Sequence, residues 1–212
     1  MKKRILIIFY ALLLCVTASF AWLSNFQPNK VTNLSVDYRG GALTVADLDF
    51  DAHIEVPDEK GEYKALSKDE QFSFDSKKMV PDTITPFKIK IKNNSETEYR
   101  KAKLSIALKV DAEEMSEANV LDVMYLEVVA GDGFGDGITY HVYVRLDEAS
   151  VVGDESNGEY FYYIYGEGDE IIIPPTTADK EYVTLDCSFY YDQNATAEYQ
   201  NKSIQAISFR LE

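Results

Sequence analysis

Histidines and cysteines are few, and their spacing matches neither a zinc site nor a nucleophile motif. The chain contains two histidines, His53 and His141, and two cysteines, Cys15 and Cys187. It contains no HExxH, no paired Cys/His zinc spacing and no GxSxG nucleophile motif. Cys187 alternates with polar residues, as a small buried hydrophobic residue does in a strand. We therefore expect a protein that is not an enzyme, with a secreted hydrolase as the weakest alternative.

Three carboxylates, Asp47, Asp49 and Asp51, are the candidates for a metal site. They occupy alternate positions, so all three would share one face of an extended strand. Hard oxygen ligands of this kind suit Ca²⁺, whereas the alternative is a solvated strand face or loop edge. We expect no resident cofactor apart from this one candidate, Ca²⁺ bound by the three aspartates.

Tyrosine is abundant, with 15 residues in the chain, and several tyrosines lie in strand-like runs. Tyr160 and Tyr162 fall in one such run and Tyr190 in another. If exposed, these rings would stack on the faces of sugar rings and make the protein a carbohydrate- or ligand-binding module. The alternative is cross-strand packing inside the sheet.

The first 21 residues have the order of a secretory signal peptide. Basic residues 2–4 precede an apolar run over residues 5–20, and Ser19 and Ala21 place small side chains two positions apart. The run is shorter than the roughly 20 residues that span a bilayer comfortably. We expect signal peptidase to cleave near Ala21 and release the chain to the cell surface or matrix. The alternative is an uncleaved membrane anchor. In both cases we expect this segment to be the only part of the chain that contacts the membrane.

The expected exported part, residues 22–212, is strongly acidic. The chain has 21 Lys+Arg and 36 Asp+Glu, a net charge of −15. Loss of the three basic residues in the first segment leaves 18 against 36, a net charge of −18. Such a surface repels phosphate backbones, so we expect no nucleic acid partner. The length suits one large β domain that folds without disulfides.

The pattern of apolar residues predicts an all-β fold. Residues 85–92 form the clearest strand, because apolar and lysine side chains alternate there, and we expect an antiparallel pair with residues 103–110. Turn signals at intervals of roughly 8–12 residues indicate a sandwich or a barrel. Residues 111–118 indicate a short helix, and residues 192–201 a short helix or loop. Further strands are expected at residues 31–38, 42–50, 53–56, 119–130, 138–146, 160–165, 171–173, 182–191 and 203–211, with one short strand near Phe72 and Phe74.

Four segments, in this order along the chain, carry a family resemblance. Residues 18–24 read Ala-Ser-Phe-Ala-Trp-Leu-Ser, and residues 31–36 form a first strand-like run. Residues 86–93 with residues 104–106 make a unit of extended strand, Asn turn and second strand, and residues 191–203 precede the last strand. Together they resemble the TasA/CalY (camelysin)-like family, exported proteins of Gram-positive bacteria with SipW-type signal peptides.

The resemblance implies a jelly-roll-like antiparallel β-sandwich with one or two short helices, exported and associated with the cell surface. Family members assemble into biofilm-matrix fibres, in which an N-terminal segment completes the sheet of a neighbouring subunit. Some members carry a metallo-endopeptidase label, for which this chain has no zinc motif. The implied partners are further copies of the chain or other matrix and surface proteins.

Two function classes remain. One is a structural or interaction protein of the cell surface or biofilm matrix, which assembles into fibres by N-terminal strand exchange. The other is a secreted carbohydrate- or ligand-binding β-sandwich. Exposed tyrosine rings on a sheet face would favour the second class, whereas self-association would favour the first.

An N-terminal arm at residues 22–31 is the segment that could join neighbouring subunits. Apolar Trp22, Leu23 and Phe26 lie there among polar residues, and Pro28 disfavours a long strand within the chain's own sheet. Such an arm can add to the open sheet edge of a neighbour. A head-to-tail contact of this kind does not close on itself and produces filaments.

We predict that the exported chain polymerises at moderate salt or low pH, and that deletion of residues 22–30 abolishes polymerisation while the fold stays intact. The net charge of −18 opposes association at low salt, and salt shortens the range of this repulsion to about 8 Å at physiological ionic strength. Light scattering of both chains across salt and pH measures the difference. An exported chain that stays monomeric throughout, or a shortened chain that polymerises equally, contradicts the prediction.

Overall fold

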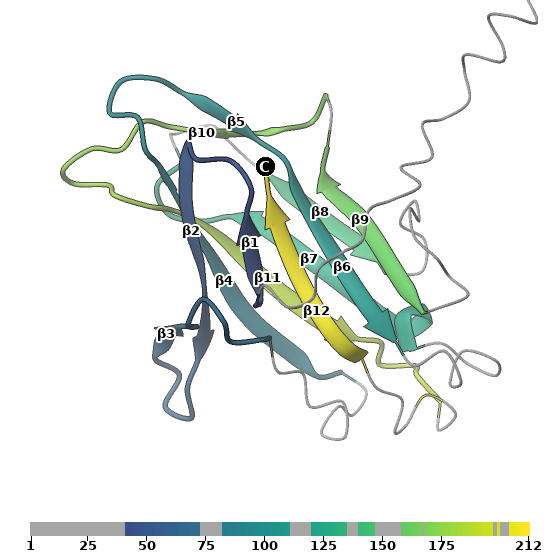
Figure 1. Ribbon diagram of the computed structural model, residues 1–212. Coiled ribbons are helices and arrows are strands. Elements are labelled where there is room, and N and C mark those ends of the chain that lie inside the picture. The colour runs from purple at the N-terminus through teal and green to yellow at the C-terminus, as the bar shows by residue number, and fades with distance from the viewer. Residues whose placement is uncertain are drawn as a thin grey trace, which may run out of the picture. The chain divides into compact units, whose positions relative to one another are not determined.

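Twelve strands and one 3-10 helix, η4 (Val120–Val123), make up the part of the chain that the structure describes (Figure 1). This computed structural model describes residues 41–72, 82–110, 120–134, 140–146, 158–166, 168–196, 199 and 204–212, all within one unit, Val36–Glu212. The expected signal peptide, the arm with Trp22, Leu23 and Phe26, the strand at residues 31–38 and the helix at residues 111–118 lie outside these residues. The strands are β1 (Leu43–Val45), β2 (Phe50–Pro57), β3 (Tyr63–Ala65), β4 (Ile84–Asn93), β5 (Arg100–Ala102), β6 (Leu104–Val110), β7 (Met124–Ala130), β8 (His141–Arg145), β9 (Glu159–Tyr165), β10 (Ile171–Ile173), β11 (Val183–Tyr191) and β12 (Ile204–Leu211).

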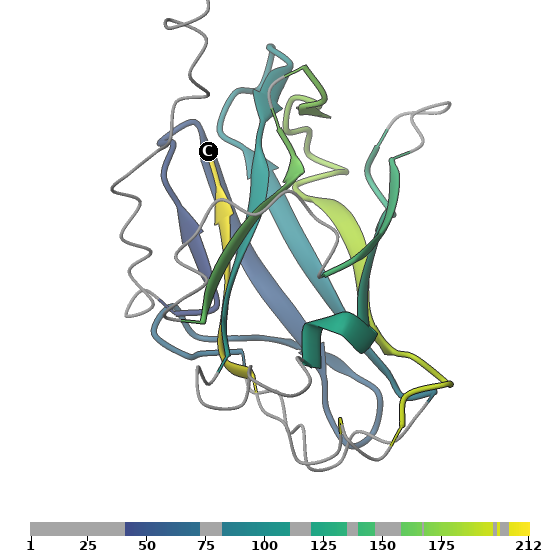
Figure 2. The ribbon, with the colours of Figure 1, turned by 90° about the vertical axis from the view of Figure 1, so that its right-hand side faces the viewer.

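Two sheets pack face to face as the predicted sandwich. The four-stranded sheet has the order β1-β12-β6-β9, and the six-stranded sheet has the order β3-β2-β4-β11-β7-β8. A ribbon of β10 and β5 lies at one end (Figure 1). All described neighbours pair antiparallel except β1, which runs parallel to β12. Figure 2 shows β12 and β6 in one layer and β11 and β7 in the other.

The two-residue period of the sequence decides which side chains each sheet buries. Phe87, Ile89 and Ile91 of β4 are at most 1% exposed and face the core, whereas Lys88 and Lys90 face outward. Adjacent β11 buries every second side chain in the same manner. The strands expected at residues 85–92 and 182–191 are therefore confirmed as the centre of the six-stranded sheet.

Four phenylalanines from different parts of the chain meet in the core, and we call them the phenylalanine cluster. Phe87 and Phe189 stack with ring centroids 5.3 Å apart, and both belong to the six-stranded sheet. Phe209 comes from the four-stranded sheet and lies 5.3 Å from Phe87. Phe72, which precedes β4, packs edge-on against Phe87 at 5.0 Å. The cluster therefore joins the two sheets.

The expected antiparallel pairing of residues 85–92 with residues 103–110 is wrong. Strand β4 pairs with β2 and β11, whereas β6 pairs with β12 and β9 in the opposite sheet. The apolar faces of β4 and β6 can be buried either beside each other or across the core, and alternation alone does not distinguish these arrangements. The connection after Asn93 crosses between the sheets instead of closing a hairpin.

Several strand limits also differ from the expectation. The run at residues 42–50 is divided into β1 and the start of β2, and the expected strand at residues 119–130 begins with η4. Phe72 is buried but lies outside any strand, and Phe74 lies outside the described residues, while β3 forms where no strand was expected. Among the described residues, no helix is long and apolar enough to cross a bilayer.

We predict that Phe87→Ala lowers the free energy of unfolding by about 3–5 kcal/mol, because it leaves a cavity between the sheets. Urea unfolding measures the loss. Ile84→Ala on the same strand is the control, since Ile84 is 52% exposed and its loss should change stability by only about 0.5 kcal/mol. Equal effects of the two substitutions would contradict the role of the phenylalanine cluster.

Candidate functional site

The outer face of the six-stranded sheet is polar along its centre. The three lysines of β4 each have a partner on β11 or on the segment just before it, a carboxylate for Lys88 and Lys92 and a hydroxyl for Lys90. Paired or shielded side chains of this kind make a solvated surface. The contacts are Lys88 to Asp186 at 3.2 Å, Lys90 to the Thr184 hydroxyl at 2.9 Å and Lys92 to Glu181 at 2.7 Å.

Aromatic side chains replace the lysines at one end of this face. Tyr125 of β7 and Tyr143 of β8 stack with ring centroids 5.2 Å apart. Tyr190 of β11 meets Tyr143 edge-on at 5.9 Å. Tyr143 is 55% exposed, and Ile84, opposite Tyr190 in the β4–β11 register, is also exposed. We call Tyr125, Tyr143 and Tyr190 the tyrosine face.

Strand register brings these three rings together. Tyr190 lies opposite Tyr125 across the β11–β7 pair, and Tyr143 lies opposite Glu127 across the β7–β8 pair. Their neighbours Leu126 and Phe189 point into the core. A shift of the register by one residue would exchange the two faces, so burial of the apolar partners fixes the tyrosines on the surface.

Carboxylates hold the tyrosine face in place. The Tyr190 hydroxyl donates to Glu127 Oε2 at 2.6 Å, and His141 Nε2 lies 2.9 Å from Glu127 Oε1. The Tyr125 hydroxyl donates to Asp192 Oδ2 at 3.4 Å. The hydrogen bond from Tyr190, with a further contribution from His141, lowers the pKa of Glu127, and the same bond raises the pKa of Tyr190. Glu127 is therefore held as the charged acceptor at this site.

The structure places the three tyrosines that were expected to stack on a ligand in two different environments. Tyr190 lies on the surface, but Tyr160 and Tyr162 are only 7% and 2% exposed. They lie opposite Leu108 and Ile106 in the β6–β9 register and belong to the core. Burial excludes these two rings from stacking on a ligand at the surface. Tyr125 and Tyr143 were missed, and their only sequence signal is alternation with apolar residues in two short runs.

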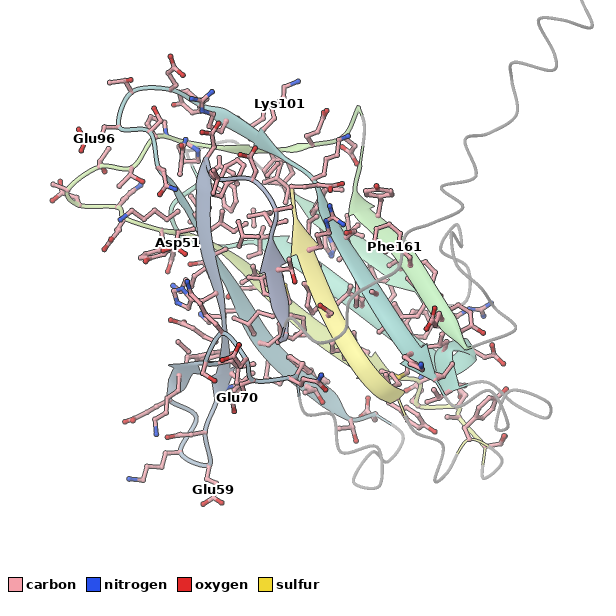
Figure 3. The ribbon with its side chains drawn as sticks, viewed as in Figure 1. Asp51, Glu59, Glu70, Glu96, Lys101 and Phe161 are labelled. Carbon is pink, nitrogen blue, oxygen red and sulfur yellow. The ribbon has the colours of Figure 1, made fainter. Side chains whose placement is uncertain are left out.

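The expected alignment of Asp47, Asp49 and Asp51 on one strand face is wrong. Strand β2 begins at Phe50, so the first two aspartates lie in the preceding turn, where the Asp49 N–H donates to Asp47 Oδ1 at 2.9 Å. Asp49 instead pairs with Arg100 at 3.4 Å. Asp51 lies on β2 (Figure 3). Within the described ranges, no three His, Cys, Asp or Glu side chains form a group that could hold a metal ion.

Two further residues singled out from the sequence, His53 and Cys187, have local roles. His53 lies 3.4 Å from Glu55 and packs edge-on against the Tyr182 ring at 5.3 Å. Cys187 is buried as expected, and its sulfur lies 3.6 Å from the Leu185 carbonyl oxygen. Burial raises the pKa of the Cys187 thiol and disfavours the thiolate that a nucleophile needs.

A cleft of about 220 Å³ lies at the other end of the six-stranded sheet. Its walls include Tyr99, Tyr182, Pro174 and Pro175, and the loop after β7 closes it at Gly133. A Cβ at Gly133 would lie 2.7 Å from the Tyr182 carbonyl oxygen, so this close approach and its φ of 95° require glycine.

Asn93 organises the loops around this cleft. It is 1% exposed, and its amide donates to the carbonyl oxygens of Glu98 at 2.8 Å and of Ile173 and Pro174 at 3.2 Å. Its Oδ1 accepts the Ser95 N–H at 2.9 Å. One side chain thus ties the turn after β4 to the segment after β10. The sequence indicated a turn at Asn93 but not these distant partners.

No protein-family model matches the chain, and no curated protein shows significant similarity to it. Function is therefore inferred from the geometry of the tyrosine face and from the sequence resemblance described above.

We predict that Glu127→Gln lowers the free energy of unfolding at about pH 7 by about 1 kcal/mol, because Tyr190 then donates to a neutral acceptor. The lowered pKa of Glu127 means that its contribution exists above its ordinary pKa of 4.5 and is lost as the pH falls through the folded value. The two proteins should therefore become equally stable once the pH is lowered below the folded pKa of Glu127. Urea unfolding at both pH values measures this.

The matched control is Glu59→Gln, at the tip of the loop that joins β2 and β3 (Figure 3). It should change stability little at either pH, because an exposed charge without a buried partner contributes little. If Glu127→Gln has the same effect at both pH values, the role of its charge is contradicted.

Proposed function

We propose that the chain is an exported, non-enzymatic interaction protein of the cell surface or biofilm matrix. The tyrosine face is the observation that carries this proposal. It places three neighbouring rings on the open face of a well-packed sheet, with Tyr143 more than half exposed. Aromatic residues clustered on an otherwise polar surface are typical of sites that bind a partner.

The contacts of His141, Tyr190 and Cys187 support a binding role over a catalytic one. His141 and Glu127 form a pair, but the hydroxyl that contacts Glu127 belongs to Tyr190. The pKa of Tyr190 is raised by that contact, which opposes its ionisation as a nucleophile. The thiol of Cys187 is buried in the core.

Carbohydrate is the ligand class that we favour for the tyrosine face. One face of a sugar ring carries C–H groups that pack on an aromatic ring, and its edge carries hydroxyls that need polar partners. Tyr143 offers the ring, while Glu127, His141 and Asp192 offer polar atoms beside it. A few convergent polar groups around an apolar contact are the usual composition of a ligand site.

Fibre assembly is the finer part of the proposal and comes from the family resemblance. In this hypothesis, the arm at residues 22–31 adds to a sheet edge of the next subunit. A sandwich provides such edges; among the described strands, β1 pairs with β12 alone. The arm-deletion experiment described above tests this part separately from ligand binding.

We predict that Tyr143→Ala weakens binding to matrix polysaccharide by about tenfold, because loss of a stacked ring removes about 1 kcal/mol or more. Co-sedimentation of the purified chain with insoluble glucose, N-acetylglucosamine and glucosamine polymers measures the binding. Tyr163→Ala is the matched control, since Tyr163 is 48% exposed on β9 of the other sheet. Equal loss of binding in both variants, or binding to none of the polymers, would contradict the carbohydrate proposal.

A further inference from the structure

The charged groups around the tyrosine face are mainly negative. Glu127 lies opposite Tyr143 in the β7–β8 register, and Asp192 accepts from the Tyr125 hydroxyl. On the facing strand, Arg145 lies opposite Tyr125, and His141 contacts Glu127. With His141 neutral, two carboxylates thus face one fixed positive charge.

Glu127 keeps acceptor capacity for a ligand, whereas Asp192 already accepts from Tyr125 and twice from Asn194. Each oxygen of an ionised carboxylate has two lone pairs, and Glu127 uses one oxygen for Tyr190 and the other for His141. The Glu127 side chain is 25% exposed, so the remaining lone pairs can be reached from the surface. The Tyr190 and Tyr125 hydroxyls already donate inward to the carboxylates. Glu127 is therefore open to a further hydrogen-bond donor, and the site suits a ligand that donates.

An ammonium group is the donor that matches this arrangement. Cations are attracted to the electron-rich faces of tyrosine rings, and an exposed contact of this kind contributes about 0.5–1 kcal/mol. A charge-assisted hydrogen bond to Glu127 would strengthen it further. The chain's net charge of −15 also attracts a cationic polymer at long range and repels a polymer of uronic acids.

We propose that the tyrosine face binds an amino sugar with a free ammonium group, as in a polymer of unacetylated glucosamine. This inference rests on the carbohydrate function proposed above. The sugar ring lies on Tyr143, and the ammonium group lies near Glu127. An N-acetyl group would remove the charge, and a neutral hexose would offer only hydroxyls. The site thus distinguishes polysaccharides by their degree of acetylation.

Calorimetric titration tests this with three oligosaccharides of equal length and linkage, built from glucosamine, N-acetylglucosamine or glucose. The purified chain should bind the glucosamine ligand about tenfold more tightly than the other two. Glu127→Gln should abolish this preference, measured as the ratio of the glucosamine affinity to the glucose affinity. Tyr143→Ala should weaken all three, whereas Tyr143→Phe should retain them because the ring remains. Thermal unfolding confirms that each variant is folded.

Glu59→Gln separates a local effect from a general one, because it removes the same charge at a distance from the tyrosine face. If both glutamate variants reduce the preference equally, net charge explains it and the proposal is overturned. Equal binding of the three ligands, lost in Tyr143→Ala, overturns the amine preference but leaves the carbohydrate function standing. Absence of binding to all three overturns both.

Discussion

Contact between the phenylalanine rings of the two sheets is the interaction on which the rest of the structure depends. Phe209 reaches across the core to Phe87 and Phe189, so each sheet buries its apolar face against the other. Removal of this surface from water is the main favourable term in folding a sandwich. It also fixes the strand registers, because a strand shifted by one residue would expose its phenylalanine.

The candidate site is a by-product of the same constraint. When β7, β8 and β11 turn their apolar residues inward, every second residue must face solvent, and these residues include Tyr125, Tyr143 and Tyr190. The rings keep their mutual distances because the strands beneath them cannot slide. If this face binds a ligand, it needs no loop closure, because the strands organise it in advance. Rigid placement also explains how carboxylates such as Glu127 can be held close to tyrosine hydroxyls.

Local pattern and long-range pairing differ in how far they can be predicted from sequence. Strand β4 was predictable because apolar and lysine residues alternate over its whole length, and so was the all-β class. Its partners were not, because alternation fixes a face and leaves the neighbouring strand undetermined. Tyr160 and Tyr162 illustrate the limit: aromatic residues in strand-like runs suit either a surface or a core, and here both rings belong to the core. Tyr125 and Tyr143 meet only through a register set by distant residues.

The burial of Asn93 has a consequence for recombinant production. Asn93-Asn94-Ser95 is an acceptor sequence for N-linked glycosylation. In the folded chain the side-chain amide of Asn93 is enclosed by three carbonyl oxygens and is out of reach of a glycosyltransferase. A eukaryotic secretory host would attach the glycan before folding, and the bulky sugar would then prevent the turn after β4 from closing. A bacterial host that lacks this modification leaves the side chain free to make its buried hydrogen bonds.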